Sequence, residues 1–217
     1  VLSVSYAALA DGSALVGSPA TRNVGTLGGN VMNGSPAMDT GAPLVVLGAE
    51  AELRSAGGSR RVGMAELWTA PGRTSARPDE LCVAVHVPAP AANSGSAYIR
   101  LEYRRAMEIA VVGAAAAVTL AGDGSVASVR VALTAVAPTI VEVTGLGGGS
   151  VADVAAAAQA AASQQARPIS DLRASDRYRR HTVGVMARRA VEAAARRAAG
   201  EHLSVPVNRA LGIGAAS

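Results

Sequence analysis

Large aromatic rings are nearly absent from this chain. Its 217 residues include no Phe, one Trp and four Tyr, although half of the residues are apolar. The core must therefore be packed from Ala, Val and Leu. A chain of this length buries roughly 70% of the surface that its unfolded form exposes, so we expect a globular protein with its own core.

Charge and cysteine content exclude several classes of protein. All 20 basic residues are Arg, the net charge is +4, and the only cysteine is Cys82. One cysteine excludes a disulfide within the chain and any zinc or iron–sulfur site built on several of its cysteines. Too few aromatic residues accompany the arginines for nucleic-acid binding. No apolar run is long enough for a membrane span, and the first residues lack the basic start of a secretory signal, so we expect a cytoplasmic protein.

The residue pattern changes near position 97, which predicts two domains, 1–96 and 97–217. The first domain is rich in Gly, Pro and Ser. We expect a short helix over 4–9, a long loop over 17–43, a buried segment leading into a strand over 44–54, and another strand over 80–87. Trp68 is expected in the core, and Cys82 is expected as a small buried side chain.

The second domain has the pattern of an α+β unit. Strands are expected over 98–104, 126–136 and 139–144, while the apolar segment 109–120 fits either a strand or a helix. Helices are expected over 151–166 and 175–199, the latter between Ser175 as N-cap and Gly200 as C-cap. The run Gly145–Ser150 is expected to be a flexible connector. These elements predict a three-stranded antiparallel sheet followed by helices.

One segment has the residue types of a ligand-binding site: RNVGTLGGNVMNGSPAMD, residues 22–39. Its TLGGN part is expected to form a tight loop, in which two glycines let the backbone approach a ligand and bind its oxygens through N–H groups. Thr26 and Asn30 add a hydroxyl and an amide, and Asp39 either caps a helix or accepts hydrogen bonds from ligand hydroxyls. A simple glycine-rich connector fits equally well. Neither the GxGxxG pattern nor a phosphate loop with Lys is present.

This segment resembles the second flavin-binding motif in the FAD subunits of the molybdenum hydroxylases, the family of carbon monoxide and xanthine dehydrogenases. The stretches PDELCVAVHVP, RRAMEIAVVGAAAAVTL and DLRASDRYRRHTVGVMARRAVEAA resemble the same family. The resemblance implies the second α/β subdomain of a vanillyl-alcohol-oxidase-like (PCMH-type) FAD-binding domain over 1–96 and the family's C-terminal domain over 97–217. Residues 1–21 lack the glycine loop of the family's first subdomain, so we expect a fragment, the product of a split gene or a shortened member.

The resemblance also implies roles for individual residues around FAD. Glycines and polar residues of the motif would lie along the ribityl and diphosphate part, the backbone of Cys82 would face the isoalloxazine, and Arg100 would lie near its pyrimidine end. A cation there would stabilise negative charge on reduced flavin. The full set of expected cofactor-binding residues is Gly25, Thr26, Leu27, Gly28, Gly29, Asn30, Asn33, Asp39, Cys82 and Arg100. No residue is expected to act as an acid or base on an organic substrate or to bind a metal.

The function implied is electron transfer by a flavin subunit of an oxidoreductase. Electrons would come from a molybdenum cofactor on a large partner subunit, through [2Fe-2S] clusters on a small partner, to FAD and then to an external acceptor. A dimer of heterotrimers is the expected assembly. The alternative is a truncated, flavin-free scaffold or docking module of the same complex; a cell-wall flavin reductase fits the second domain less well.

Overall fold

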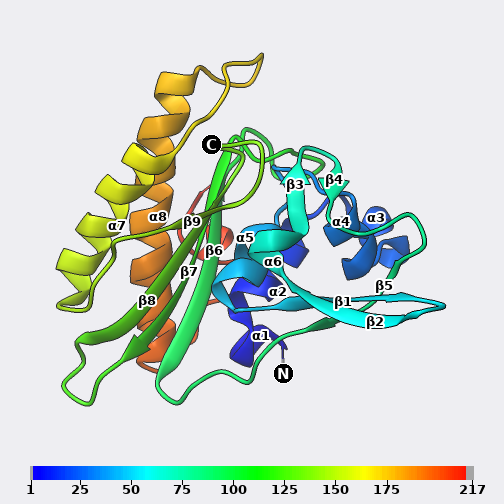
Figure 1. Cartoon of the computed structure of the whole chain (residues 1–217). Helices are drawn as coiled ribbons and strands as arrows, with labels where there is room; N and C mark the ends of the chain where they lie inside the picture. Colours follow the sequence, from blue (N-terminus) through cyan, green and yellow to red (C-terminus); the bar gives the residue numbers. More distant parts are fainter. Residues whose placement is uncertain (1, 214–217) are drawn as a thin grey trace.

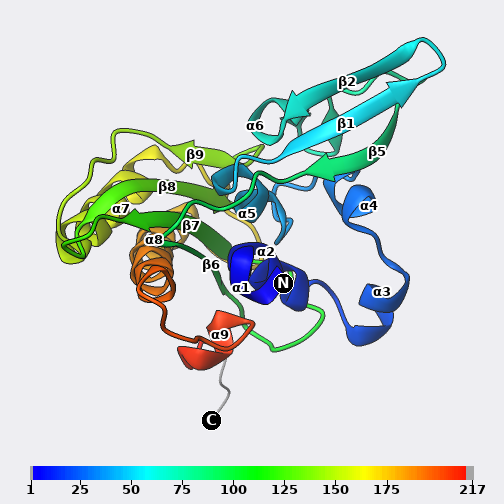
Figure 2. The same cartoon turned by 90° about the horizontal axis from the view of Figure 1, so that it is seen from below.

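Two units meet along one face of a central sheet in the computed structural model, which describes residues 2–213 (Figure 1). The N-terminal unit contains short helices and small sheets, and the C-terminal unit contains the central sheet and two long helices. The two helices cover one face of that sheet, and helices of the N-terminal unit lie against the opposite face (Figure 2). None of the described helices combines the length and apolar character needed to cross a bilayer.

The N-terminal unit alternates short helices with antiparallel hairpins. Its helices are α1 (Leu2–Ser5), α2 (Ala7–Leu15), α3 (Pro19–Val24), α4 (Leu27–Met32), α5 (Gly41–Val46) and α6 (Met64–Leu67). Its strands are β1 (Glu50–Ser55), β2 (Gly58–Gly63), β3 (Trp68–Ala70), β4 (Arg73–Thr74) and β5 (Leu81–His86). The strand order is β2-β1-β5 in one antiparallel sheet, and β3 pairs with β4 in another. As expected, Trp68 is buried, and its indole N–H donates to Val31 O at 2.9 Å.

The C-terminal unit is an antiparallel sheet in the order β6-β7-β8-β9, followed by helices. Its strands are β6 (Ser94–Leu101), β7 (Val112–Leu120), β8 (Val126–Thr134) and β9 (Val141–Val143), and its helices are α7 (Val151–Gln165), α8 (Asp176–Ala198) and α9 (Val207–Ala210). Ser175 caps α8, as the sequence predicts, by accepting the N–H of Tyr178 at 3.2 Å. The two long helices begin and end within one residue of the predicted bounds.

The sheet has four strands where three were expected, because the ambiguous segment forms β7. Ala114 and Ala116 face the core under α7 and α8, whereas Ala115 faces the second core toward the N-terminal unit. A strand buried on both faces shows no alternation of polar and apolar residues. Its sequence therefore resembles that of a buried helix.

Small residues let backbones approach one another at two contacts of the C-terminal unit. A Cβ atom on Gly95 of β6 would lie 2.4 Å from Ala194 O of α8. A Cβ atom on Gly148 would lie 2.5 Å from Val126 O, and the neighbouring Gly149 pairs with Val126 through two backbone hydrogen bonds. Gly148 and Gly149, near the end of the expected connector 145–150, therefore lie against the start of β8.

The N-terminal segments are more helical than the sequence suggested. The expected helix over 4–9 is replaced by α1 and the longer α2, whose Gly12 packs against the Asp39 carbonyl. The expected loop over 17–43 contains α3, α4 and the start of α5. These helices are only six residues long, too short for a periodic apolar pattern to reveal them.

Candidate functional site

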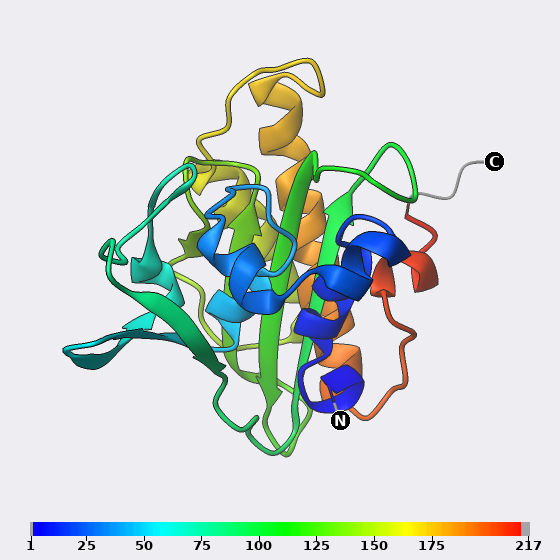
Figure 3. The same ribbon diagram turned by 90° about the vertical axis from the view of Figure 1, so that its right-hand side faces the viewer.

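A pocket of about 450 Å³ is lined largely by residues on and around the short helices α3 and α4. These helices lie on the side of the molecule away from α7 (Figures 2 and 3). This volume lies in the range of small-molecule sites. The lining comes from the end of α2, from α3 and α4, and from the residue before α5. Its lining residues are Ser13, Val16, Thr21, Arg22, Gly25, Thr26, Leu27, Gly29, Asn30, Asn33 and Thr40.

The TLGGN stretch forms the start of α4 rather than the expected tight loop. Thr26 is the N-cap residue, and its Oγ1 accepts the N–H of Gly29 at 3.0 Å. Neither Gly28 nor Gly29 has a positive φ, so the glycines are needed for space and not for a left-handed backbone. A Cβ atom on Gly29 would lie 3.0 Å from Thr26 Oγ1. The glycines leave this side of the pocket as bare backbone that a ligand can approach closely.

Asn30 is held in place by a residue that the sequence reasoning did not assign. The hydroxyl of Thr40 donates to Asn30 Oδ1 at 2.5 Å, and both residues line the pocket. Because the amide oxygen is already bonded, the NH2 group of Asn30 is the part that is available to a ligand. Thr40 directly follows Asp39 at the end of the motif, and this position was the only sign of its role.

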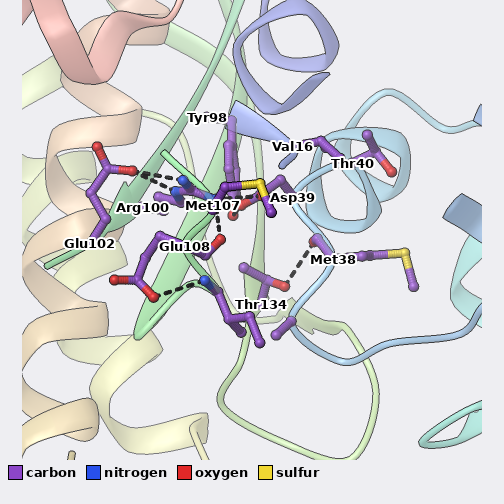
Figure 4. A network of polar contacts seen from close by, with 12 residues as sticks. Val16, Met38, Asp39, Thr40, Tyr98, Arg100, Glu102, Met107, Glu108 and Thr134 are labelled. Atoms are coloured by element: carbon purple, nitrogen blue, oxygen red, sulfur yellow. Dashed lines mark hydrogen bonds and ion pairs between the residues drawn. The ribbon is translucent and has the colours of Figure 1, made fainter. Parts of the chain in front are cut away.

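Asp39 and Arg100 form a buried polar network underneath Thr40 (Figure 4). Asp39 accepts the hydroxyl of Tyr98 at 2.9 Å through Oδ1 and Nη1 of Arg100 at 2.6 Å through Oδ2. Nε of Arg100 donates to Glu102 Oε2 at 2.8 Å; Nη2 lies equally near that oxygen but without hydrogen-bond geometry. Burial raises the pKa of Asp39 to about 6, although the charge of Arg100 opposes the shift.

The network encloses the side chains of Asp39 and Arg100, for which the resemblance implied contacts with FAD. Arg100 is fully buried and Asp39 is 6% exposed, and neither lines the pocket. Both carboxylate oxygens of Asp39 are bonded within the protein, and the guanidinium of Arg100 is enclosed between two carboxylates. Asp39 is thereby fixed next to the backbone of Thr40, and the contacts of Asp39 and Arg100 with FAD stay a prediction.

The same network reaches the C-terminal helix α9. Arg209 Nη1 donates to Glu102 Oε1 at 2.6 Å. Asn208 bonds both backbone groups of Arg100, at 3.1 Å to the N–H and 2.8 Å to the carbonyl. Residues from α9, β6 and the loop before α5 are thereby held in one arrangement.

Cys82 lies on β5 beside α4, outside the pocket lining. The carbonyl of Cys82 is the nearest group, at 4.0 Å, to a Cβ atom built on Gly28. Its thiol is partly buried, and burial raises the pKa of the Cys82 thiol. Its neighbours Leu81 and Val83 are exposed. The backbone of α4 at Gly28 therefore lies opposite the backbone of β5 at Cys82, with no side chain between them.

Acidic and histidine side chains do not gather at this site. His86 Nε2 lies 2.8 Å from Glu52 Oε2 on the sheet of the N-terminal unit. Within residues 2–213, no three His, Cys, Asp or Glu side chains are grouped so that they could hold a metal ion.

Of the expected cofactor-binding residues, six line one pocket. These are Gly25, Thr26, Leu27, Gly29, Asn30 and Asn33. Gly28 and Cys82 lie beside it, and Asp39 and Arg100 lie beneath it. The sequence reasoning did not assign Ser13, Val16, Thr21, Arg22 or Thr40. Arg22 belongs to the motif of residues 22–39.

Comparisons with known proteins find matches to both units. Residues 1–90 match the family described as the FAD binding domain in molybdopterin dehydrogenase, and residues 97–194 match the CO dehydrogenase flavoprotein C-terminal domain. The putative xanthine dehydrogenase FAD-binding subunit XdhB of Escherichia coli is 32% identical in an alignment over 200 residues that covers 89% of this chain and 68% of that protein. The carbon monoxide dehydrogenase medium chain of Afipia carboxidovorans is 36% identical in an alignment over 191 residues that covers 86% of this chain and 66% of that protein.

Solved structures give the same result. A crystal structure of the Cu,Mo-CO dehydrogenase superposes with a TM-score of 0.85 and 33% identity, covering 90% of this chain and 70% of the other. The chain thus spans about two thirds of the length of these relatives. The fold, the pocket and the motif point to one conclusion: the chain belongs to the FAD-binding subunits of the molybdenum hydroxylases, which transfer electrons within oxidoreductase complexes.

Proposed function

We propose that this chain binds FAD in the pocket beside α3 and α4 and carries electrons for a molybdenum-containing dehydrogenase. The main support for this proposal is the pocket. Six of the residues that the flavin-binding motif implies line it, within the part of the chain that matches the FAD-binding domain family. Bound FAD would supply a carrier that takes up two electrons and releases them singly or in pairs.

The donor groups of the pocket fit part of such a cofactor. Bare glycine backbone in α4 admits a close approach, and the NH2 group of Asn30 and the side chain of Asn33 provide donors and acceptors for hydroxyl groups. The backbone of Gly28 and the carbonyl of Cys82 lie close together, because a Cβ atom at Gly28 would already be 4.0 Å from Cys82 O. The chain's own contribution is to bind and orient the cofactor.

Partner subunits are part of the proposal. A chain with one cysteine cannot hold iron–sulfur clusters by itself. The relatives include medium chains of carbon monoxide dehydrogenases, so a large subunit with the molybdenum cofactor and a small subunit with [2Fe-2S] clusters are the expected partners. We propose a dimer of heterotrimers in the cytoplasm. Mass measurement of the native complex, with fractionation of cell extract, tests both statements.

Replacement of Gly29 by Val tests the pocket assignment. A Val side chain would displace the Thr26 hydroxyl that caps α4 and would occupy the bare side of the pocket, so the purified complex should lose its FAD absorbance. Gly63→Val is the matched control, because a Cβ atom at Gly63 meets nothing within 4 Å. Stoichiometric FAD in Gly29→Val would contradict the placement. A wild-type complex that is assembled but colourless would favour the alternative of a flavin-free scaffold.

A further inference from the structure

Arg22 is the only charged side chain among the residues that line the pocket. It lies on α3, four residues before the N-cap of α4. Its Nη1 donates to Val16 O at 2.8 Å, which ties the guanidinium to the chain segment just after α2. The side chain is therefore both exposed and anchored at the edge of the pocket.

The charge of Arg22 has no carboxylate partner in the described part of the chain. Most other arginines of the N-terminal unit lie within 4 Å of a carboxylate: Arg54, Arg60, Arg61 and Arg77 do so. Arg22 is bonded instead to a neutral carbonyl, which fixes its position without compensating its charge. A positive charge left uncompensated at the edge of a pocket raises the local concentration of anions.

The chemistry of the neighbouring groups indicates which anion would bind. A guanidinium matches the geometry of phosphate oxygens through two parallel N–H donors, and one donor on Val16 O leaves others free. The hydroxyl-bearing residues Thr21 and Thr26 also line this pocket. A doubly charged diphosphate is therefore better suited to this site than an uncharged ring system.

We propose that Arg22 binds the diphosphate of FAD and makes the pocket prefer the dinucleotide to riboflavin. This inference rests on the proposed function, because it names the residue that would recognise the charged part of the cofactor. Arg22 acts by direct contact and not through the buried network, whose charges are already paired with one another.

The inference is tested on the complete complex after removal of its flavin. FAD and riboflavin are titrated separately against wild type, Arg22→Gln and Arg22→Lys, with binding followed by flavin fluorescence at two salt concentrations. Gln carries no charge, and its amide nitrogen stands two bonds before the terminal nitrogens of Arg; Lys keeps the charge but loses the planar fork. Arg189→Gln, on the exposed side of α8, is the control that removes one charge far from the pocket.

Arg22→Gln should weaken FAD binding about tenfold or more, as expected for loss of hydrogen bonds to a charged group, and should leave riboflavin binding and the melting temperature unchanged. Its FAD affinity should also depend less on salt than that of the wild type, and Arg22→Lys should lie between the two. Equal FAD affinity in wild type and Arg22→Gln would overturn this inference alone. A wild-type complex that binds neither flavin would overturn the proposed function as well.

Discussion

The C-terminal unit and the pocket segment, residues 16–40, differ in what holds them in place. In the C-terminal unit, apolar side chains fill both faces of the sheet, and α7 and α8 close one of those faces. The pocket segment has few buried side chains, and its helices are short and largely exposed. Side-chain packing therefore stabilises the fold. The pocket, in contrast, is made of backbone and polar groups that lie against the packed unit.

Charged networks join the N-terminal unit, including the end of the pocket segment, to the C-terminal unit. Arg100 of β6 links Asp39, at the end of the pocket segment, to Glu102 and through it to Arg209 of α9. A second network lies on α2, where Asp11 accepts Nη1 of Arg197 at 2.6 Å and two backbone N–H groups. Since these charges are buried, each depends on its partner for compensation.

The strongest test of the comparison removes the charge that joins the regions. Arg100→Met keeps the apolar stem but leaves Asp39 as a buried carboxylate without its cationic partner, while Glu102 keeps only its ion pair with Arg209. We expect a loss of about 3–5 kcal/mol in the free energy of unfolding, measured by urea denaturation at pH 7. If flavin is bound, the same variant also tests the contact between Arg100 and the pyrimidine end that the resemblance implies, through a fall in the flavin midpoint potential.

A surface ion pair provides the control for Arg100. Arg188 pairs with Glu192 at 2.8 Å on the exposed side of α8, and an exposed helical pair contributes about 0.3–0.5 kcal/mol. Arg188→Met should therefore change stability by less than about 0.5 kcal/mol. Equal effects of the two substitutions would contradict the role of Arg100 as a buried link.

A second test changes the packing of the C-terminal unit only. Gly184 lies where α8 meets α7, and a Cβ atom there would lie 2.2 Å from Ser163 Oγ and 2.7 Å from Gln159 O. Gly184→Ala should therefore push the helices apart and cost about 1–3 kcal/mol of stability, measured by thermal unfolding. Gly122→Ala, in open space on a turn, is the matched control. A stable Gly184→Ala variant would show that the helix pair adjusts more easily than the packing suggests.

The two regions also differ in how far the sequence predicts them. The helices α7 and α8 have long apolar faces and clear ends, so their bounds follow from periodicity and from the Ser175 cap. The segment β7 was ambiguous because Ala residues face both cores. In the pocket segment, the motif identified six lining residues, but the burial of Arg100 depends on carboxylates brought together from residues 39 and 102, a contact that no local pattern reveals.

A third test uses pH to probe the sheet of the N-terminal unit. Two hydrogen bonds from Arg60 and one from the N–H of Arg77 lower the pKa of Glu80 to about 2. Its ordinary value is 4.5, so the unfolded chain binds the proton first as the pH falls. The stability that Glu80 contributes is therefore complete above about pH 4.5 and is lost between pH 4.5 and 2.

Glu80→Gln should lower the melting temperature at pH 7, and its difference from wild type should shrink as the pH falls toward 2. Thermal unfolding followed by circular dichroism over this range measures the effect. Glu66→Gln, at an exposed acid of α6, should leave the melting temperature unchanged at pH 7. A difference between Glu80→Gln and wild type that stays constant from pH 7 to pH 2 would rule out the ion-paired carboxylate as its cause.

The smallest expected effect concerns Thr40, which holds a pocket residue in position. Thr40 is 2% exposed, and its hydroxyl holds Asn30 Oδ1. Thr40→Val keeps the shape of the side chain and removes that hydrogen bond, which is worth about 0.5–1.5 kcal/mol. Because the freed Asn30 amide would no longer present its NH2 group in one orientation, FAD affinity should fall about three- to tenfold while the melting temperature changes little.

Thr119→Val on β7, outside this pocket, controls for the loss of a hydroxyl. Fluorescence titration of the two variants decides the question: unchanged FAD affinity in Thr40→Val would mean that Asn30 does not depend on Thr40 for its position.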